Sequence, residues 1–321
     1  MKDRNGSSVK EFILLGFPGS VELKIFLFMF FFFMYILTIF GNVAIIVLVK
    51  SRQQLHTPMY FFLGNLSFLE IWYSTALVPK TLAILVSQYK TITFIGCITQ
   101  MYFVFSLGCA ECFLLAVMAY DRYLAICHPL HYNTIMSKTL SLQMALSAWI
   151  CGFLAMSLPA FLITRLTFCD SNIINHFFCD IDPWIILSCT DTYTIHIVWF
   201  IIAFVVILGS CVTTMISYVY IISTILKISS AQGRQRAFST CSSHLTVVLI
   251  WYGSIIFLHV IPFKQSSLEL TKIVTILNTI VTPLLNPFIY TLRNTEVKEA
   301  LRSIFRSTTL TLFDRKHKDN K

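Results

Sequence analysis

The sequence predicts an all-α membrane protein: a bundle of seven transmembrane helices followed by a short amphipathic helix. Of its 321 residues, 56% are hydrophobic and only 12% are charged, whereas soluble domains carry about 25% charged residues. The mean hydropathy is +0.75. The apolar residues form long runs, without the alternation that marks the roughly 10-residue strands of membrane barrels. So large an apolar surface is explained if the helices face lipid.

Seven runs are long enough to cross a bilayer, which takes about 20 mostly apolar residues. They cover residues 25–49, 58–79, 91–120, 139–164, 192–226, 237–263 and 273–292. The joins between them are short and polar, so we expect one helical domain (25–292) between an N-terminus (1–24) and a tail (293–321). Apolar and basic residues at helical spacing over 294–306 predict the amphipathic helix, lying on the membrane surface.

Basic residues predict the orientation of the chain. Fifteen of the 24 Lys and Arg residues fall on the side of the membrane that carries the C-terminus. By the positive-inside rule, the C-terminus of this multi-pass plasma-membrane protein is cytoplasmic and the N-terminus is extracellular. The glycosylation sequon at Asn5 then lies outside. The net charge of +9 follows from this topology and from contact with anionic membrane lipid, so we expect no nucleic-acid partner.

Several motifs lie at the ends of the predicted spans. The sequence Asp121-Arg122-Tyr123 ends the third span, and Asn286-Pro287-Phe288-Ile289-Tyr290 ends the seventh. Longer strings are LHTPMY at 55–60, AICHPLHY at 125–132, AFSTCSSHL at 237–245 and PLLNP at 283–287. Together, over nearly the whole chain and in this order, they resemble the odorant-receptor family of rhodopsin-like G-protein-coupled receptors.

The resemblance implies a receptor rather than an enzyme. Its partners would be a small-molecule odorant and a stimulatory-type heterotrimeric G protein, whose activation raises cyclic AMP. The residues that would switch and couple are Asp121, Arg122, Tyr123, Tyr218, Asn286, Pro287 and Tyr290. A charge pair at the membrane edge is expected on physical grounds alone, since an unpaired charge there costs a few kcal/mol. The plainer alternatives are a charge pair that only anchors its helix and a static proline kink.

The ligand site is expected in the outer half of the bundle. Carried over by position, its residues are Val104, Phe105, Gly108, Cys109, Cys112, Ile202, Ala203, Val206, Tyr252, Ile255, Ile256, His259, Ile276 and Thr279. Val104 stands where amine receptors carry an Asp, so a mostly neutral, lipophilic, volatile ligand fits best. A mainly apolar lining with a few polar points is usual for small-molecule pockets. For any single residue of this set, plain helix packing is the competing interpretation.

Glu70 and Glu111 are the acidic residues inside the predicted spans. Two ionised carboxylates buried together repel each other, so either one holds a proton or a cation lies between them. In related receptors the position of Glu70 belongs to a sodium site, which makes both residues candidate sodium ligands with support from Asn42 and Asn286. A shared proton explains the pair equally well. Apart from this sodium ion, we expect no cofactor.

Four cysteines fall on the extracellular side, where disulfides persist. We expect Cys97 to pair with Cys179 and Cys169 with Cys189; a Cys97–Cys189 pair is the rival. His176, three residues before Cys179, would suit a soft metal only if that thiolate were free. A transporter or channel would predict inverted repeats or a file of charges, and an enzyme would predict a nucleophile or metal motif. The sequence contains neither pattern.

Overall fold

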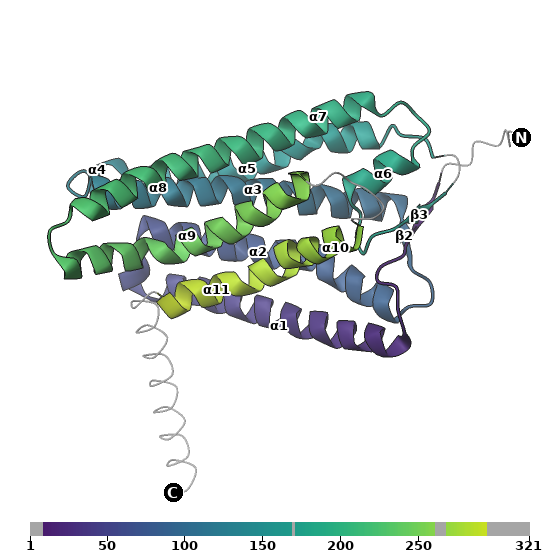
Figure 1. Ribbon diagram of the computed structural model, residues 1–321, viewed down its shortest axis with the longest axis horizontal. Coiled ribbons are helices and arrows are strands. Elements are labelled where there is room, and N and C mark those ends of the chain that lie inside the picture. Colours follow the sequence, from purple (N-terminus) through teal and green to yellow (C-terminus); the bar gives the residue numbers. More distant parts are fainter. Residues whose placement is uncertain (1–8, 169–170, 261–267, 294–321) are drawn as a thin grey trace, which may run out of the picture.

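The computed structural model describes residues 9–168, 171–260 and 268–293. Within these ranges, seven helical segments are long and apolar enough to cross a membrane, which confirms the predicted fold class. They lie side by side along the longest axis of the molecule (Figure 1). The segments are α1 (Val21–Ser51), α2 (Pro58–Val86), α3 (Phe94–Cys127), α5 (Lys138–Ile163), α7 to α8 (Tyr193–Lys227), α9 (Ala231–Val260) and α10 to α11 (Leu268–Arg293). The amphipathic helix predicted over 294–306 lies outside the described residues.

Hydroxyl side chains fix the starts of three of these helices. Ser20 accepts a hydrogen bond from the backbone N–H of Leu23 at 3.3 Å, as the N-cap of α1. Thr93 and Ser137 do the same for α3 and α5, at 3.1 and 3.2 Å. Such caps satisfy N–H groups that have no partner inside the helix. Helix α2 begins instead with Pro58, whose missing N–H costs nothing at the first helical position.

Two spans contain a π-helical turn. In the fifth span, α7 (Tyr193–Ala203) continues through the turn η2 (Phe204–Leu208) into α8 (Gly209–Lys227). In the seventh, α10 (Leu268–Ile276) continues through η4 (Leu277–Val281) into α11 (Thr282–Arg293). A π turn inserts a residue, and such turns recur at functional sites. Helical spacing counted from one side of such a turn therefore does not carry over unchanged to the other.

Helix α3 occupies the centre of the bundle and packs against α2, α5, α8 and α9. Its approach to α5 depends on Gly152, because a Cβ atom there would lie 2.7 Å from the backbone nitrogen of Ala110. Helix α1 lies at the periphery, and Phe26, Phe33 and Phe40 on it are more than 60% exposed. In a bilayer these side chains face lipid.

A small three-stranded sheet closes one end of the bundle, which the sequence had not predicted (Figure 1). Strand β1 (Glu11–Leu14) lies between β2 (Thr91–Thr93), with which it is antiparallel, and β3 (Ile173–Ile174), with which it is parallel. Phe12 of β1 is fully buried, with its ring 4.9 Å from that of Trp184 in the short helix α6 (Ile181–Leu187). At the opposite end of the bundle are the short helices η1 (Gln53–Leu55) and α4 (Tyr132–Ile135).

Candidate functional site

The motif at the end of α3 forms a closed network of polar side chains. Arg122 donates to Oδ2 of Asp121 from Nη2 at 2.6 Å and from Nε at 3.1 Å. The hydroxyl of Tyr132, on α4, donates to the other carboxylate oxygen at 2.7 Å. Asp121 is fully buried and Arg122 is 9% exposed. The neighbouring Tyr123 hydroxyl bonds to Nε2 of His128 at 2.9 Å. In this conformation the guanidinium of Arg122 is engaged with its own neighbour.

A second polar contact joins α8 to α9 near the same end. The hydroxyl of Tyr218 donates to the backbone oxygen of Cys241 at 3.2 Å and lies 2.8 Å from Nδ1 of His244. Both side chains are buried. Close by, the thiol of Cys127 on α3 lies 3.1 Å from the hydroxyl of Thr224 on α8. Sequence reasoning had named Tyr218 but not His244, although His244 stands within the AFSTCSSHL string.

Pro287 lies inside α11, where it cannot donate a hydrogen bond to the oxygen of Pro283 four residues earlier. Asn42 of α1 supplies the missing donor, with Nδ2 3.2 Å from that oxygen. The two helices approach closely here, since a Cβ on Gly41 would lie 3.2 Å from the Pro287 ring. The donor therefore comes from another helix and not from the neighbouring Asn286, which bonds to Glu70. Tyr290, one turn further on, is 3% exposed.

Glu70, Glu111 and Asn286 meet in the middle of the bundle. Asn286 donates to Oε1 of Glu70, and the two carboxyl groups are neighbours. Both glutamates are fully buried. Among the described residues, Oε2 of Glu70, both carboxyl oxygens of Glu111 and Oδ1 of Asn286 have no hydrogen-bond partner. Unsatisfied oxygens of this kind suit a hard cation or a shared proton equally.

Residues predicted for the ligand site converge between α3 and α9. The indole N–H of Trp251 lies 3.4 Å from the Cys112 thiol, and the Tyr252 hydroxyl donates to the Cys112 backbone oxygen at 3.2 Å. The ring of Phe105 packs edge-on against Trp199, with centroids 5.2 Å apart. Neither tryptophan was among the predicted residues. The positions carried over from related receptors named Tyr252, next to Trp251, and Ile202, about one turn after Trp199. One apolar cluster contains Val104, Phe105, Cys109, Cys112, Ile202, Val206, Tyr252, Ile255 and Ile276.

The remaining predicted residues lie around this cluster or away from it. Thr279 is buried, and its hydroxyl donates to the backbone oxygen of Thr275 in the same segment at 2.7 Å. Ala203 is 8% exposed, and a Cβ on Gly108 would meet no atom within 4 Å. Ile256 is 44% exposed and stands apart from the cluster. The side chain of His259 lies outside the part of the chain that the structure describes.

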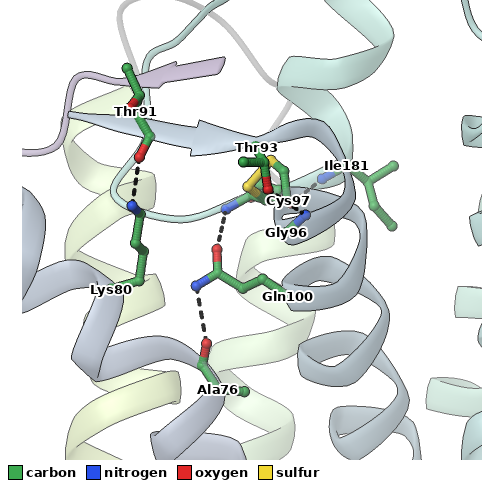
Figure 2. The surroundings of a disulfide bond; sticks show 10 residues. Ala76, Lys80, Thr91, Thr93, Gly96, Cys97, Gln100 and Ile181 are labelled. Carbon is green, nitrogen blue, oxygen red and sulfur yellow. Dashed lines mark hydrogen bonds between the residues drawn. A yellow bond between two sulfur atoms is a disulfide. The ribbon is translucent and has the colours of Figure 1, made fainter. Parts of the chain in front are cut away.

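The loop between α5 and α7 covers the sheet end of the bundle and is fastened to α3. A disulfide joins Cys97 to Cys179. One helical turn below, Gln100 accepts a hydrogen bond from the Cys179 backbone N–H at 3.1 Å and donates to the Ala76 oxygen of α2 at 3.0 Å (Figure 2). This pairing leaves no thiol at Cys97 for the rival bond. Cys169, the expected partner of the fourth cysteine, is outside the described residues.

His176 and Asp180 lie within this loop. The ring of His176 is fully buried, with Nε2 4.0 Å from Oδ2 of Asp180. Burial, helped by the charge of Lys272, lowers the pKa of His176 to about 3. Burial and the nearby Asp182 raise the pKa of Asp180 to about 7. With the Cys179 thiolate consumed, the described residues contain no cluster of three metal-ligating side chains.

Comparison with known proteins agrees with this architecture. The family profile described as "Olfactory receptor" matches residues 31–308. Olfactory receptor 287 of Rattus norvegicus is 66% identical over 299 residues, which cover 93% of this chain and 96% of that receptor. Olfactory receptor 6F1 of Homo sapiens is 64% identical over 301 residues, which cover 94% of this chain and 98% of that receptor. The chain therefore belongs to the olfactory receptor family of G-protein-coupled receptors.

Proposed function

We propose that this receptor binds small, mostly neutral lipophilic odorants in the outer half of its helix bundle and activates a stimulatory-type G protein, which raises cyclic AMP. Family membership makes the chain a multi-pass plasma-membrane receptor rather than an enzyme. The distribution of basic residues supports an extracellular N-terminus and a cytoplasmic C-terminus. In this orientation the sheet covers the ligand end and the Asp121–Arg122 pair faces the G protein.

The contact of Cys112 with Trp251 and Tyr252 carries this proposal. It joins α3 to α9 inside the apolar cluster, and α9 also bears His244, which holds Tyr218 near the cytoplasmic end. An odorant that inserts beside Cys112 would change how these two helices pack. If it binds better to the arrangement in which the Arg122 pair is open, its differential affinity supplies the free energy of the switch.

The experiment is a cyclic AMP assay in cells that express the receptor with an olfactory-type G protein, screened against diverse volatile compounds. We expect a dose-dependent rise for some of them. Replacement Tyr252→Phe removes only the hydroxyl bonded to Cys112, and it should shift the dose response by roughly fivefold, the effect of one hydrogen bond of about 1 kcal/mol. Phe105→Ala, in the same cluster, should weaken the response further.

The control is Tyr220→Phe, because Tyr220 is 56% exposed on α8 and the change keeps the ring that packs against Tyr123. It should respond like the wild type. Silence to all compounds, despite confirmed surface expression and a working G protein, would count against the coupling. Equal responses of the Tyr252 and Tyr220 variants would place the ligand elsewhere.

We also propose that Glu70 and Glu111 bind a sodium ion, with Asn286 holding one carboxylate. The unsatisfied oxygens around them support an oxygen-ligated cation. Sodium should then raise the Tm of the purified receptor relative to N-methylglucamine at equal ionic strength, and Glu111→Gln should abolish the difference. If the pair shares a proton instead, the Tm will not depend on the cation.

A further inference from the structure

A cavity of about 510 Å³ lies on the outside of the bundle, between α2 and α3, at the end closed by the sheet. We call it the α2–α3 groove. Three of the side chains that line it, those of Trp72, Thr75 and Thr99, are exposed. It therefore opens on the surface that faces lipid, and none of the residues predicted for the ligand site lines it.

The groove is amphipathic along its length. Its inner half is apolar, with the Trp72 and Phe103 rings stacked at 6.2 Å. Its outer end carries Lys80, with Gln100 beside it (Figure 2). Lys80 follows Trp72 by eight residues, a rise of about 12 Å along a helix. One leaflet of a bilayer has a hydrocarbon depth of about 15 Å, so the groove matches a chain lying parallel to the helices.

Lys80 is placed to hold an anion at the end of such a chain. Its ammonium group has three N–H donors. Among the described residues it donates one hydrogen bond, to the Thr91 oxygen at 2.6 Å (Figure 2). A charged hydrogen bond to a carboxylate is roughly twice as strong as a neutral one. Gln100, another polar residue of the lining, is already held between Ala76 and Cys179, so it adds a fixed dipole to the wall.

We propose that the α2–α3 groove binds a single-chain anionic amphiphile, of which a long-chain fatty acid is the simplest. Its carboxylate contacts Lys80, and its chain lies along Trp72 and Phe103. Cavities of roughly 300–1,000 Å³ each hold one small molecule, which favours one acyl chain over a two-chain phospholipid. Because Gln100 connects the groove wall to the disulfide loop, an occupied groove also braces the cover over the ligand site.

The test uses the full receptor in phosphatidylcholine nanodiscs with palmitate that carries a photoreactive diazirine. After illumination, adducts are mapped by mass spectrometry. We expect them on 71–103, and we expect unlabelled palmitate to compete. An alcohol probe of the same chain length should label about tenfold less, because it lacks the charge that Lys80 recognises. Palmitate added to the nanodiscs should also raise the Tm of the wild type.

Matched variants separate charge recognition from misfolding. Lys80→Gln should reduce labelling about tenfold. Lys80→Arg keeps the charge and should be labelled like the wild type. Lys90→Gln is the control, because Lys90 also donates to a backbone oxygen at this end, that of Leu15, but does not line the groove. Trp72→Ala should weaken labelling, and Phe33→Ala, on exposed α1, should not.

Two results would overturn the proposal. One is that the acid and alcohol probes label equally and that the Lys80→Gln variant is labelled as strongly as the wild type. The groove would then be ordinary lipid-contacting surface without selectivity for charge. The other is adducts concentrated outside 71–103. Neither depends on odorant response or G-protein coupling, so this test can fail while the proposed function stands, and the reverse also holds.

Discussion

His176, which is fully buried, and Asp180, which is partly buried, contribute opposite pH dependences to the stability of the receptor. The pKa of His176 falls from about 6.5 to about 3 on folding, so acidification through 6.5 favours the unfolded state, which binds more protons. The pKa of Asp180 rises to about 7, so acidification from 7 favours the folded state. The two contributions have opposite signs between pH 7 and pH 5. These two residues together should therefore contribute little net pH dependence to the stability of the receptor in this range.

Asp180→Asn should reveal the pH response of His176, because the opposing contribution of Asp180 is removed. Asparagine keeps the oxygen that caps the Ile181 N–H at 2.7 Å, but it no longer titrates. We expect the Tm of this variant to fall between pH 7 and pH 5, with a free-energy slope approaching about 1.4 kcal/mol per pH unit below 6.5. The Tm is measured by tryptophan fluorescence of the purified receptor.

The comparison is with Asp191→Asn, an exposed acid of the same loop, which should behave like the wild type. Parallel pH profiles for the wild type and the Asp180 variant would show that the histidine is not held neutral by its surroundings.

Between elements, the contact of α8 with α9 is the one whose loss should be seen most directly in signalling. Tyr218 is held by His244 and by the Cys241 oxygen while Arg122 stays paired with Asp121. His244→Phe removes one of these two hydrogen bonds and preserves an aromatic ring. If the contact stabilises the resting arrangement, basal cyclic AMP should rise by roughly fivefold, the population shift expected from about 1 kcal/mol.

Tyr218→Phe tests the same contact from the other side. It removes both hydrogen bonds, but it also removes a hydroxyl that we expect to stabilise the active state, so the maximal odorant response should fall. Opposite effects of the two variants would support a switch. Unchanged basal activity in His244→Phe, at equal surface expression, would reduce the contact to static packing.

Helix ends illustrate where hydropathy is a sound guide and where it is not. The apolar run that predicts the third span ends at Tyr120, but α3 continues to Cys127. The apolar run stops before Asp121 and Arg122 because both side chains are charged. The helix continues through them because each satisfies the other and Tyr132 satisfies the remaining carboxylate oxygen. Pairing of side chains is not visible in a running average.

Over the whole molecule, local signals predicted the helices and distant contacts determined the rest. Seven apolar runs are properties of short stretches of sequence, so the bundle could be predicted. The hydrogen bond from Asn42 to Pro283 joins residues 241 positions apart. The meeting of Glu70 with Asn286 spans 216 positions. Each residue could be nominated from its motif, but its partner depends on how the helices pack.

The sheet at the end of the bundle also bears on how the chain is made. Strand β1 is synthesised first, yet Ile13 pairs with Thr91 and then with Ile173. At about 5–20 residues per second, the last partner arrives roughly 8–30 s after the first strand. Two spans separate β1 from β2, and two more separate β2 from β3. The three strands can therefore meet only if all four spans have been inserted in the right direction. Closure of the sheet thus requires the correct topology of the first four spans, and it can occur before the remaining three spans are in place.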